Sequence, residues 1–168
     1  ELSRNRDDKR CSVAKTLLSR NDYLAGHPRA AVSTAMKKVS AKIRQLKVGQ
    51  TISLSGRIVT GRDRLHRHLW NGGKSPVDLT DGAIYHSGPV VIRKEGAWIV
   101  RAAGPTTSMR QEPYMSRIIE QHHVRVIIGK GGMGEATRRT CAKFGCVYLQ
   151  TVGGAGAVLA ETVKQVVG

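Results

Sequence analysis

Two glycine-bounded turns in the second half of the chain constrain its fold most. Residues 104–110 (GPTTSMR) and 128–134 (IGKGGMG) each leave a strand-like stretch and lead into a helix-like one. Helix N-termini expose unpaired N–H groups and the positive end of the helix dipole, which favour anions. Together with Arg110 and Lys130, these turns predict a pocket for a small carboxylate-bearing or phosphorylated molecule.

Strand-like and helix-like segments alternate along the rest of the domain. We expect strands over residues 51–60 (interrupted at Gly56), 83–86, 97–103, 124–128 and 146–151. We expect helices from about residue 61, and over 114–121, 135–144 (ended by Gly145) and 155–166. This order indicates an α/β layered domain with a mixed sheet.

The first 46 residues are predicted to form a basic arm of two helical segments that precedes the domain of residues 47–168. Apolar residues recur there at near-helical spacing, and Gly26-His27-Pro28 separates the two segments. The arm is rich in Arg, Ser, Ala and Lys, which is typical of an organelle-targeting leader or its processed edge. We therefore expect a location in the mitochondrial matrix or the cytoplasm.

The net charge of +16 is large for 168 residues. Half of it comes from residues 1–50, which hold 12 Lys and Arg against 4 Asp and Glu. Such an excess favours polyanionic partners such as RNA, an anionic membrane surface or an acidic protein, although a solvated basic surface explains it equally. No apolar run approaches transmembrane length. The three cysteines do not suggest a disulfide framework and fit a reducing compartment.

Each turn has alternative interpretations. Thr106 and Thr107 could simply cap a helix. The turn around Lys130 lacks the spacing of a nucleotide P-loop. It could be a plain strand–helix turn, or the Gly-x-x-Gly loop of an RNA-binding KH module, although Glu135 then stands where an apolar core residue is expected.

A third cluster, Arg62, Asp63 and His66, shares one face of the helix that begins near residue 61. Arg62 could bind a carboxylate through two hydrogen bonds. His66 could be an acid–base group or a structural histidine. The histidines and cysteines do not make a metal-ligand pattern, so we predict no metal site in this chain.

Five ordered motifs resemble one family. They look like the β subunit, or C-terminal domain, of iron–sulfur hydro-lyases, namely class I fumarase and L(+)-tartrate dehydratase, over residues 46–166. The motifs are Leu54-Ser55-Gly56 with Thr60-Gly61-Arg62-Asp63 and His66, Ile84-Tyr85-His86-Ser87-Gly88-Pro89, Gly104-Pro105-Thr106-Thr107-Ser108-Met109-Arg110, Ile128-Gly129-Lys130-Gly131, and Gly153-Gly154-Ala155.

The resemblance implies a swivelling β/β/α domain in a reaction that reversibly adds water to a small dicarboxylate. The substrate pair would be fumarate and malate, or tartrate and oxaloacetate. A [4Fe–4S] cluster, held by a partner subunit or domain, would bind the substrate hydroxyl and one carboxylate. This chain would close over the other end. The resemblance also implies roles for residues of this chain. The substrate-binding residues would be Arg62, Arg110, Lys130, Gly104 and Thr107. The candidate base would be Thr106, and the supporting residues would be Asp63 and His66.

Three features depart from the family pattern. Gln111 stands where the family usually has methionine, the C-terminal end is shortened, and the basic arm is not a recognised family feature. These departures leave a second hypothesis open. The chain could be a catalytically retired copy that serves as a basic structural subunit of a large RNA–protein complex such as a mitochondrial ribosome.

Overall fold

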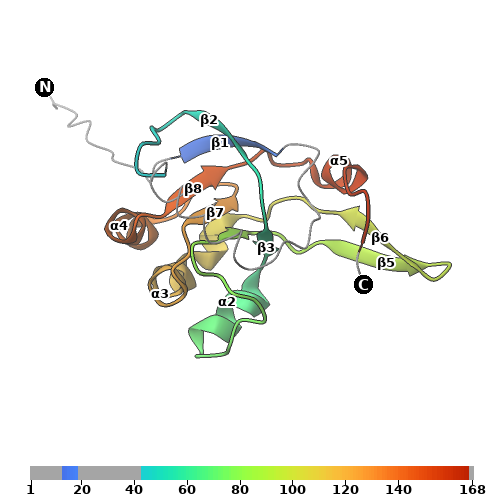
Figure 1. The fold of residues 1–168 in the computed structure, drawn as a ribbon, viewed down its shortest axis with the longest axis horizontal. Helices are drawn as coiled ribbons and strands as arrows, with labels where there is room; N and C mark the ends of the chain where they lie inside the picture. Colours follow the sequence, from blue (N-terminus) through green and yellow to red (C-terminus); the bar gives the residue numbers. More distant parts are fainter. Residues whose placement is uncertain (1–12, 19–42, 167–168) are drawn as a thin grey trace, which may run out of the picture.

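The main sheet has six strands, and every neighbouring pair is parallel. A computed structural model of the chain describes residues 13–18 and 43–166. The strand order is β2-β1-β8-β7-β4-β3 (Figure 1). The strands are β1 (Val13–Leu18), β2 (Thr51–Leu54), β3 (Ile58–Thr60), β4 (Ala83–Tyr85), β7 (Val126–Gly129) and β8 (Val147–Gln150).

The central strands β4, β7 and β8 are buried on both faces, as their runs of Ile, Val and Tyr require. Successive side chains of a strand point to opposite faces. Ile84 and Ile127 therefore belong to one core, with residues of the helices, while Tyr85 and Ile128 belong to the core on the other face.

Three helices contribute to the first of these cores: α2 (Asp63–Trp70), α3 (Glu112–His122) and α4 (Glu135–Phe144) (Figure 1). Helix α3 follows a 3₁₀ turn, η1 (Ser108–Gln111), and has Pro113 in its first turn, where proline is tolerated. Gly145 ends α4 in the left-handed conformation, as the sequence predicted. A short last helix, α5 (Gly156–Glu161), packs against β6.

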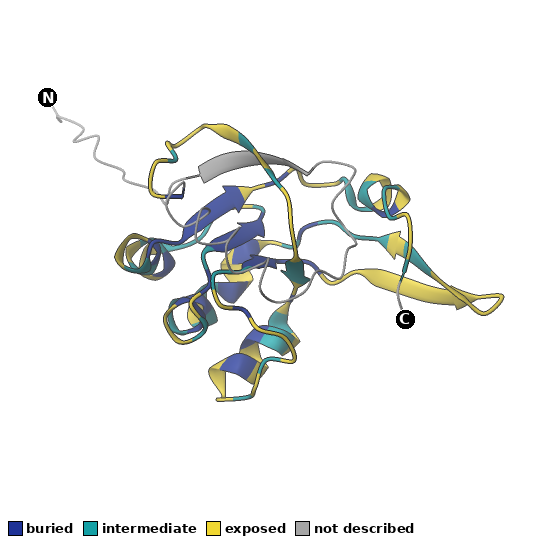
Figure 2. Cartoon of the chain, in the orientation of Figure 1, coloured by how far each residue is buried: buried dark blue, intermediate teal, exposed yellow. Residues whose placement is uncertain are grey.

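Strands β5 (Val90–Lys94) and β6 (Ala97–Ala102) form a separate antiparallel hairpin that projects from the sheet (Figure 1). The sequence predicted β6 but not β5. Glu95 and Gly96 both have positive φ, as in a tight two-residue hairpin turn. Every residue of β5 is exposed (Figure 2). Parallel and antiparallel pairs both occur, as expected, but they are divided between two sheets.

Two other predictions about elements need correction. The helix predicted near residues 13–18 is wrong, because this segment is strand β1 and pairs with β2 and β8 in the sheet. The remainder of the predicted arm, up to residue 42, lies outside the described residues. Helix α5 ends at Glu161 rather than at residue 166. None of the helices in the described part of the chain is long and apolar enough to cross a membrane.

Candidate active site

The predicted site residues gather at one edge of the main sheet. Because the six strands are parallel, the carboxyl ends of β3, β4 and β7 meet at the same edge. Arg62 comes shortly after β3, His86 directly after β4, and Lys130 directly after β7. Open α/β sheets bind their ligands at this edge. The topology alone therefore places Arg62 and Lys130 where a ligand is expected.

The turn of residues 104–107 is hydrogen-bonded across this edge. The Thr106 N–H donates to the carbonyl of His86 at 2.7 Å, and the Ser108 N–H donates to the carbonyl of Lys130 at 2.9 Å. Segments that lie 20 or more residues apart in the sequence thus form one hydrogen-bonded surface. The structure brings the two glycine-bounded turns together, as one shared pocket requires.

Three cations border this surface. Arg62 extends across Gly88, where an added Cβ would lie 2.4 Å from the Arg62 Cδ atom. The aliphatic stem of Lys130 lies against Gly153, where an added Cβ would lie 3.3 Å from the Lys130 Cδ atom. Among the described residues, no hydrogen bond or ion pair engages the guanidinium of Arg110 or the ammonium of Lys130. These two charges are therefore available to an anionic ligand.

Asp63 lies among these cations and is held by Gln111. The Gln111 Nε2 atom donates to the Asp63 Oδ1 atom at 2.9 Å, and an Arg62 nitrogen lies 3.8 Å from the other carboxylate oxygen. The hydrogen bond from Gln111 is the main reason that the pKa of Asp63 is lowered. Arg62 and Arg110 act in the same direction, against the effect of burial. An ionised Asp63 offsets part of the positive charge around the site.

The other predicted residues differ in exposure. Thr106 is half-buried and Thr107 is exposed, and the Thr107 side chain makes no capping bond to η1. Gly104 packs closely on Gly156 of α5. His66 is fully buried, so it can influence a ligand only through its neighbours.

The N-terminus of α4, which the sequence offered as an anion site, is already occupied. Its Gly134 and Thr137 N–H groups donate to the Glu112 carboxylate at 2.8 and 3.1 Å, and the Thr137 hydroxyl donates at 2.7 Å. Glu112 comes from the start of α3 and caps α4 across the helix pair. Lys130, rather than the N-terminus of α4, is therefore the group at the second turn that is available to an anion.

A buried polar cluster lies beneath the site, and no role was predicted from the sequence for most of its members. The rings of His66 and His86 are 5.0 Å apart and nearly perpendicular. His86 Nδ1 lies 2.9 Å from the Ser108 hydroxyl, and the Tyr148 hydroxyl donates to the same Ser108 oxygen at 3.0 Å. His66, His86 and Ser108 each lie in a sequence motif, but nothing in the sequence indicated that these side chains meet.

Both histidines are kept neutral. Burial is the main cause of the lowered pKa of each, and it brings the pKa of His86 down to about 3. His66 Nδ1 lies 2.8 Å from the carbonyl of Arg62, which can only accept, so this nitrogen carries the proton.

The neutral state of His86 predicts a dependence of stability on pH. The folded protein leaves His86 unprotonated down to about pH 3, whereas the unfolded chain binds a proton below about pH 6.5. The unfolded state therefore binds more protons in this window, and stability falls as pH falls. Between about pH 7 and about pH 5, His86 should cost about 2 kcal/mol of unfolding free energy.

Urea unfolding of the wild type and of His86→Asn at both pH values measures this cost. Carboxylates and His66 affect both proteins, so the difference between their pH dependences reports on His86. Equal dependences would mean that His86 ionises as readily in the folded protein as in the unfolded chain.

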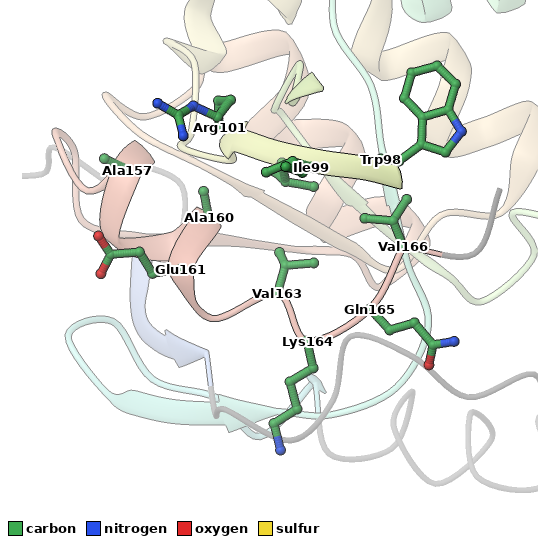
Figure 3. Close-up of a pocket in the computed structure, with 11 residues that line it drawn as sticks. Trp98, Ile99, Arg101, Ala157, Ala160, Glu161, Val163, Lys164, Gln165 and Val166 are labelled. Carbon is green, nitrogen blue, oxygen red and sulfur yellow. The ribbon is translucent and has the colours of Figure 1, made fainter. Parts of the chain in front are cut away.

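A cavity of about 520 Å³ lies apart from these residues, between β6, α5 and the segment after α5 (Figure 3). Trp98 and Arg101 line it from β6, and Val163 and Lys164 line it from the last segment. None of the predicted site residues contributes to it. The cavity and the candidate active site are therefore separate features.

The described residues do not fit an iron–sulfur cluster. No group of three or more His, Cys, Asp or Glu side chains comes together in the described part of the chain. Cys141 and Cys146 are buried in the core, and Cys11 lies outside the described residues.

Comparisons with known proteins agree with the motifs. Residues 8–168 match the family model described as "Fumarase C-terminus". The chain is 45% identical over 128 residues to a Geobacillus stearothermophilus protein provisionally named a class I fumarate hydratase. It is 38% identical over 125 residues to the L(+)-tartrate dehydratase subunit beta of Escherichia coli. A Methanocaldococcus jannaschii protein, provisionally given the same subunit name, is 36% identical over 137 residues.

The matched regions cover different shares of these proteins. They span 76%, 74% and 79% of this chain, but 25%, 62% and 70% of the respective relatives. The chain thus spans about a quarter of the Geobacillus protein. The three relatives come from bacteria and an archaeon, and their names refer to hydro-lyases. The comparisons give no support to the RNA-scaffold hypothesis or to a mitochondrial location.

Proposed function

Because the chain belongs to the fumarase C-terminal family, we propose that it is the substrate-binding β subunit of a hydro-lyase. The reaction would reversibly add water to, or remove it from, a small dicarboxylate. The observation that carries this proposal is the meeting of Thr106, Arg110 and Lys130 on hydrogen-bonded turns at the carboxyl edge of a parallel sheet.

The proposed carboxylate-binding residues are Arg62, Arg110 and Lys130. Gly104 and Thr107, from the turn of residues 104–107, are proposed to contact the substrate as well. A dianionic substrate requires several fixed positive charges. The same charges would stabilise the negative charge that builds up on a carboxylate when a proton is removed from the adjacent carbon. Asp63, held by Gln111, would keep Arg62 in place between turnovers.

Thr106 is the proposed base that removes this proton. A threonine hydroxyl is a weak base in water, so the role requires nearby cations that lower its pKa. Its backbone is fixed by the hydrogen bond to His86, while its side chain is only half-buried and can face a ligand. His66 would support the site from beneath.

A [4Fe–4S] cluster would be held by a partner subunit or domain, since the described residues offer no ligand set for it. The roles proposed here concern only this chain's own residues. The predicted domain boundary at residue 47 does not agree with strand β1 (Val13–Leu18), which lies within the main sheet between β2 and β8. The swivelling movement over the substrate is a further part of the proposal.

Purification of the chain from its native source, without oxygen and at low salt, tests this function. We expect an iron-containing partner in equal copy number, and turnover by the complex of fumarate, malate or tartrate. A particle rich in nucleic acid and free of iron would contradict the proposal, as would an iron-containing complex that is inactive on all three acids.

A further inference from the structure

His86 joins strand β7 to the turn of residues 104–107 through its backbone. Its N–H donates to the carbonyl of Ile128 at 2.8 Å, and its carbonyl accepts the Thr106 N–H at 2.7 Å. The residue is fully buried. A change at His86 therefore reaches Thr106 without passing through solvent.

The His86 side chain also contacts Ser108, the residue that directly follows this turn. Its Nδ1 atom lies 2.9 Å from the Ser108 hydroxyl oxygen, and that oxygen accepts the Tyr148 hydroxyl proton at 3.0 Å. The proton of Ser108 is then free to be donated to His86 Nδ1, which leaves the ring proton on Nε2. The Ser108 N–H meanwhile donates to the carbonyl of Lys130.

Gly129 leaves the space that this arrangement needs. A Cβ at Gly129 would lie 1.9 Å from the Ser108 oxygen and 3.3 Å from His86 Nδ1. The serine and the imidazole thus pack directly against the backbone of β7, one residue before Lys130. The contact tolerates little displacement because the interior is close-packed.

The ring of His66 extends the cluster to the start of α2. It packs edge-on against the His86 ring at 5.0 Å, and its Nδ1 donates to the carbonyl of Arg62. Neither Nε2 atom has a hydrogen-bond partner in the described structure, although both are buried. Buried polar atoms without partners are uncommon in folded proteins.

We propose that His86 is a positioning residue: through Ser108, its imidazole fixes the spacing between the turns that carry Thr106, Arg110 and Lys130. This inference rests on the proposed function. Thr106, Arg110 and Lys130 would act on one small dicarboxylate, so the distances between them must stay nearly constant. A displacement of about 1 Å can reduce the rate about 10²-fold.

Two substitutions of His86 distinguish the role of its Nδ1 atom from that of its Nε2 atom. Asparagine places an amide atom near Nδ1 and can keep the bond to Ser108, whereas glutamine reaches toward Nε2 and cannot. We expect His86→Asn to keep most of kcat and His86→Gln to lower kcat about 10²-fold, with a smaller change in KM. Ser108→Ala should resemble His86→Gln, and the double variant should lose little more, because both remove one contact.

The measurements are kcat, KM and thermal stability of each variant in the complex with its iron–sulfur partner. A purely packing role predicts that kcat follows stability, and therefore that Asn and Gln are equally impaired. That result would overturn the inference, as would full activity of His86→Gln.

Amide NMR of the full chain separates this inference from the proposed function. If the wild-type complex turns over none of the dicarboxylates, the proposed function fails. The positioning role still predicts large shifts of the Thr106, Arg110 and Lys130 amides in His86→Gln and small ones in His86→Asn. Similar shifts in both variants would refute it.

Discussion

Replacing Lys130 with alanine is expected to reduce turnover by the complex about 10²–10³-fold while the fold survives. The ammonium of Lys130 has no ion-pair partner among the described residues, so its removal breaks no structural contact of that charge. The loss of one fixed charge at a developing anion typically has an effect of this size. Steady-state kinetics give the effect on rate, and thermal unfolding tests the fold.

Lys143→Ala is the matched control, because Lys143 is an exposed lysine in the last turn of α4. It should keep the wild-type rate. Lys130→Arg keeps the charge but changes its shape, and it should recover part of the rate. A Lys130→Ala complex as active as the wild type would remove Lys130 from the site.

Replacing Gly104 with alanine is the second change from which we expect a large effect. Its Cβ would lie 2.8 Å from the Cα of Gly156 and 3.1 Å from the Gly156 nitrogen. Both are backbone atoms, so no side-chain rotation relieves the clash, and the turn or α5 must move. Overpacking of this kind costs about 1–3 kcal/mol. Turnover should fall as well, because the same turn carries Thr106.

Gly156→Ala tests the same close approach from the other side. A Cβ there would lie 3.4 Å or more from its neighbours, which is ordinary contact, and its φ is not positive. We expect an unfolding free energy equal to that of the wild type or up to about 1 kcal/mol higher, since alanine favours a helix over glycine. Urea unfolding of both variants gives the comparison. Equal losses in both would contradict this account of the contact.

Local patterns predicted most of the fold. Strands β4 and β7 are short apolar runs, and α4 has an apolar period with Gly145 at its end, so neighbouring residues determine each element. Strand β1 could not be found in this way. Its residues have helix-like spacing, but they become a strand by pairing with β2 and β8, which lie far away in the sequence.

In the candidate site, too, local sequence indicates some features, whereas others depend on contacts between distant residues. Arg62, Arg110 and Lys130 could be proposed from the sequence because each follows a turn that a glycine marks. The buried contacts of Ser108 with His86 and Tyr148 were not, since they join residues 22 and 40 positions apart. Nor could the sequence reveal that Glu112 of α3 occupies the N-terminus of α4.

Two hydrogen bonds at the base of the β5–β6 hairpin join the residues before β5 to the residues after β6. The Tyr85 hydroxyl donates to the carbonyl of Ala103 at 3.0 Å, and the Ser87 hydroxyl donates to the carbonyl of Gly104 at 2.8 Å. Neither hydrogen bond involves the hairpin tip at Glu95. Changes in the length or sequence of the hairpin tip should therefore leave the turn at the candidate active site in place.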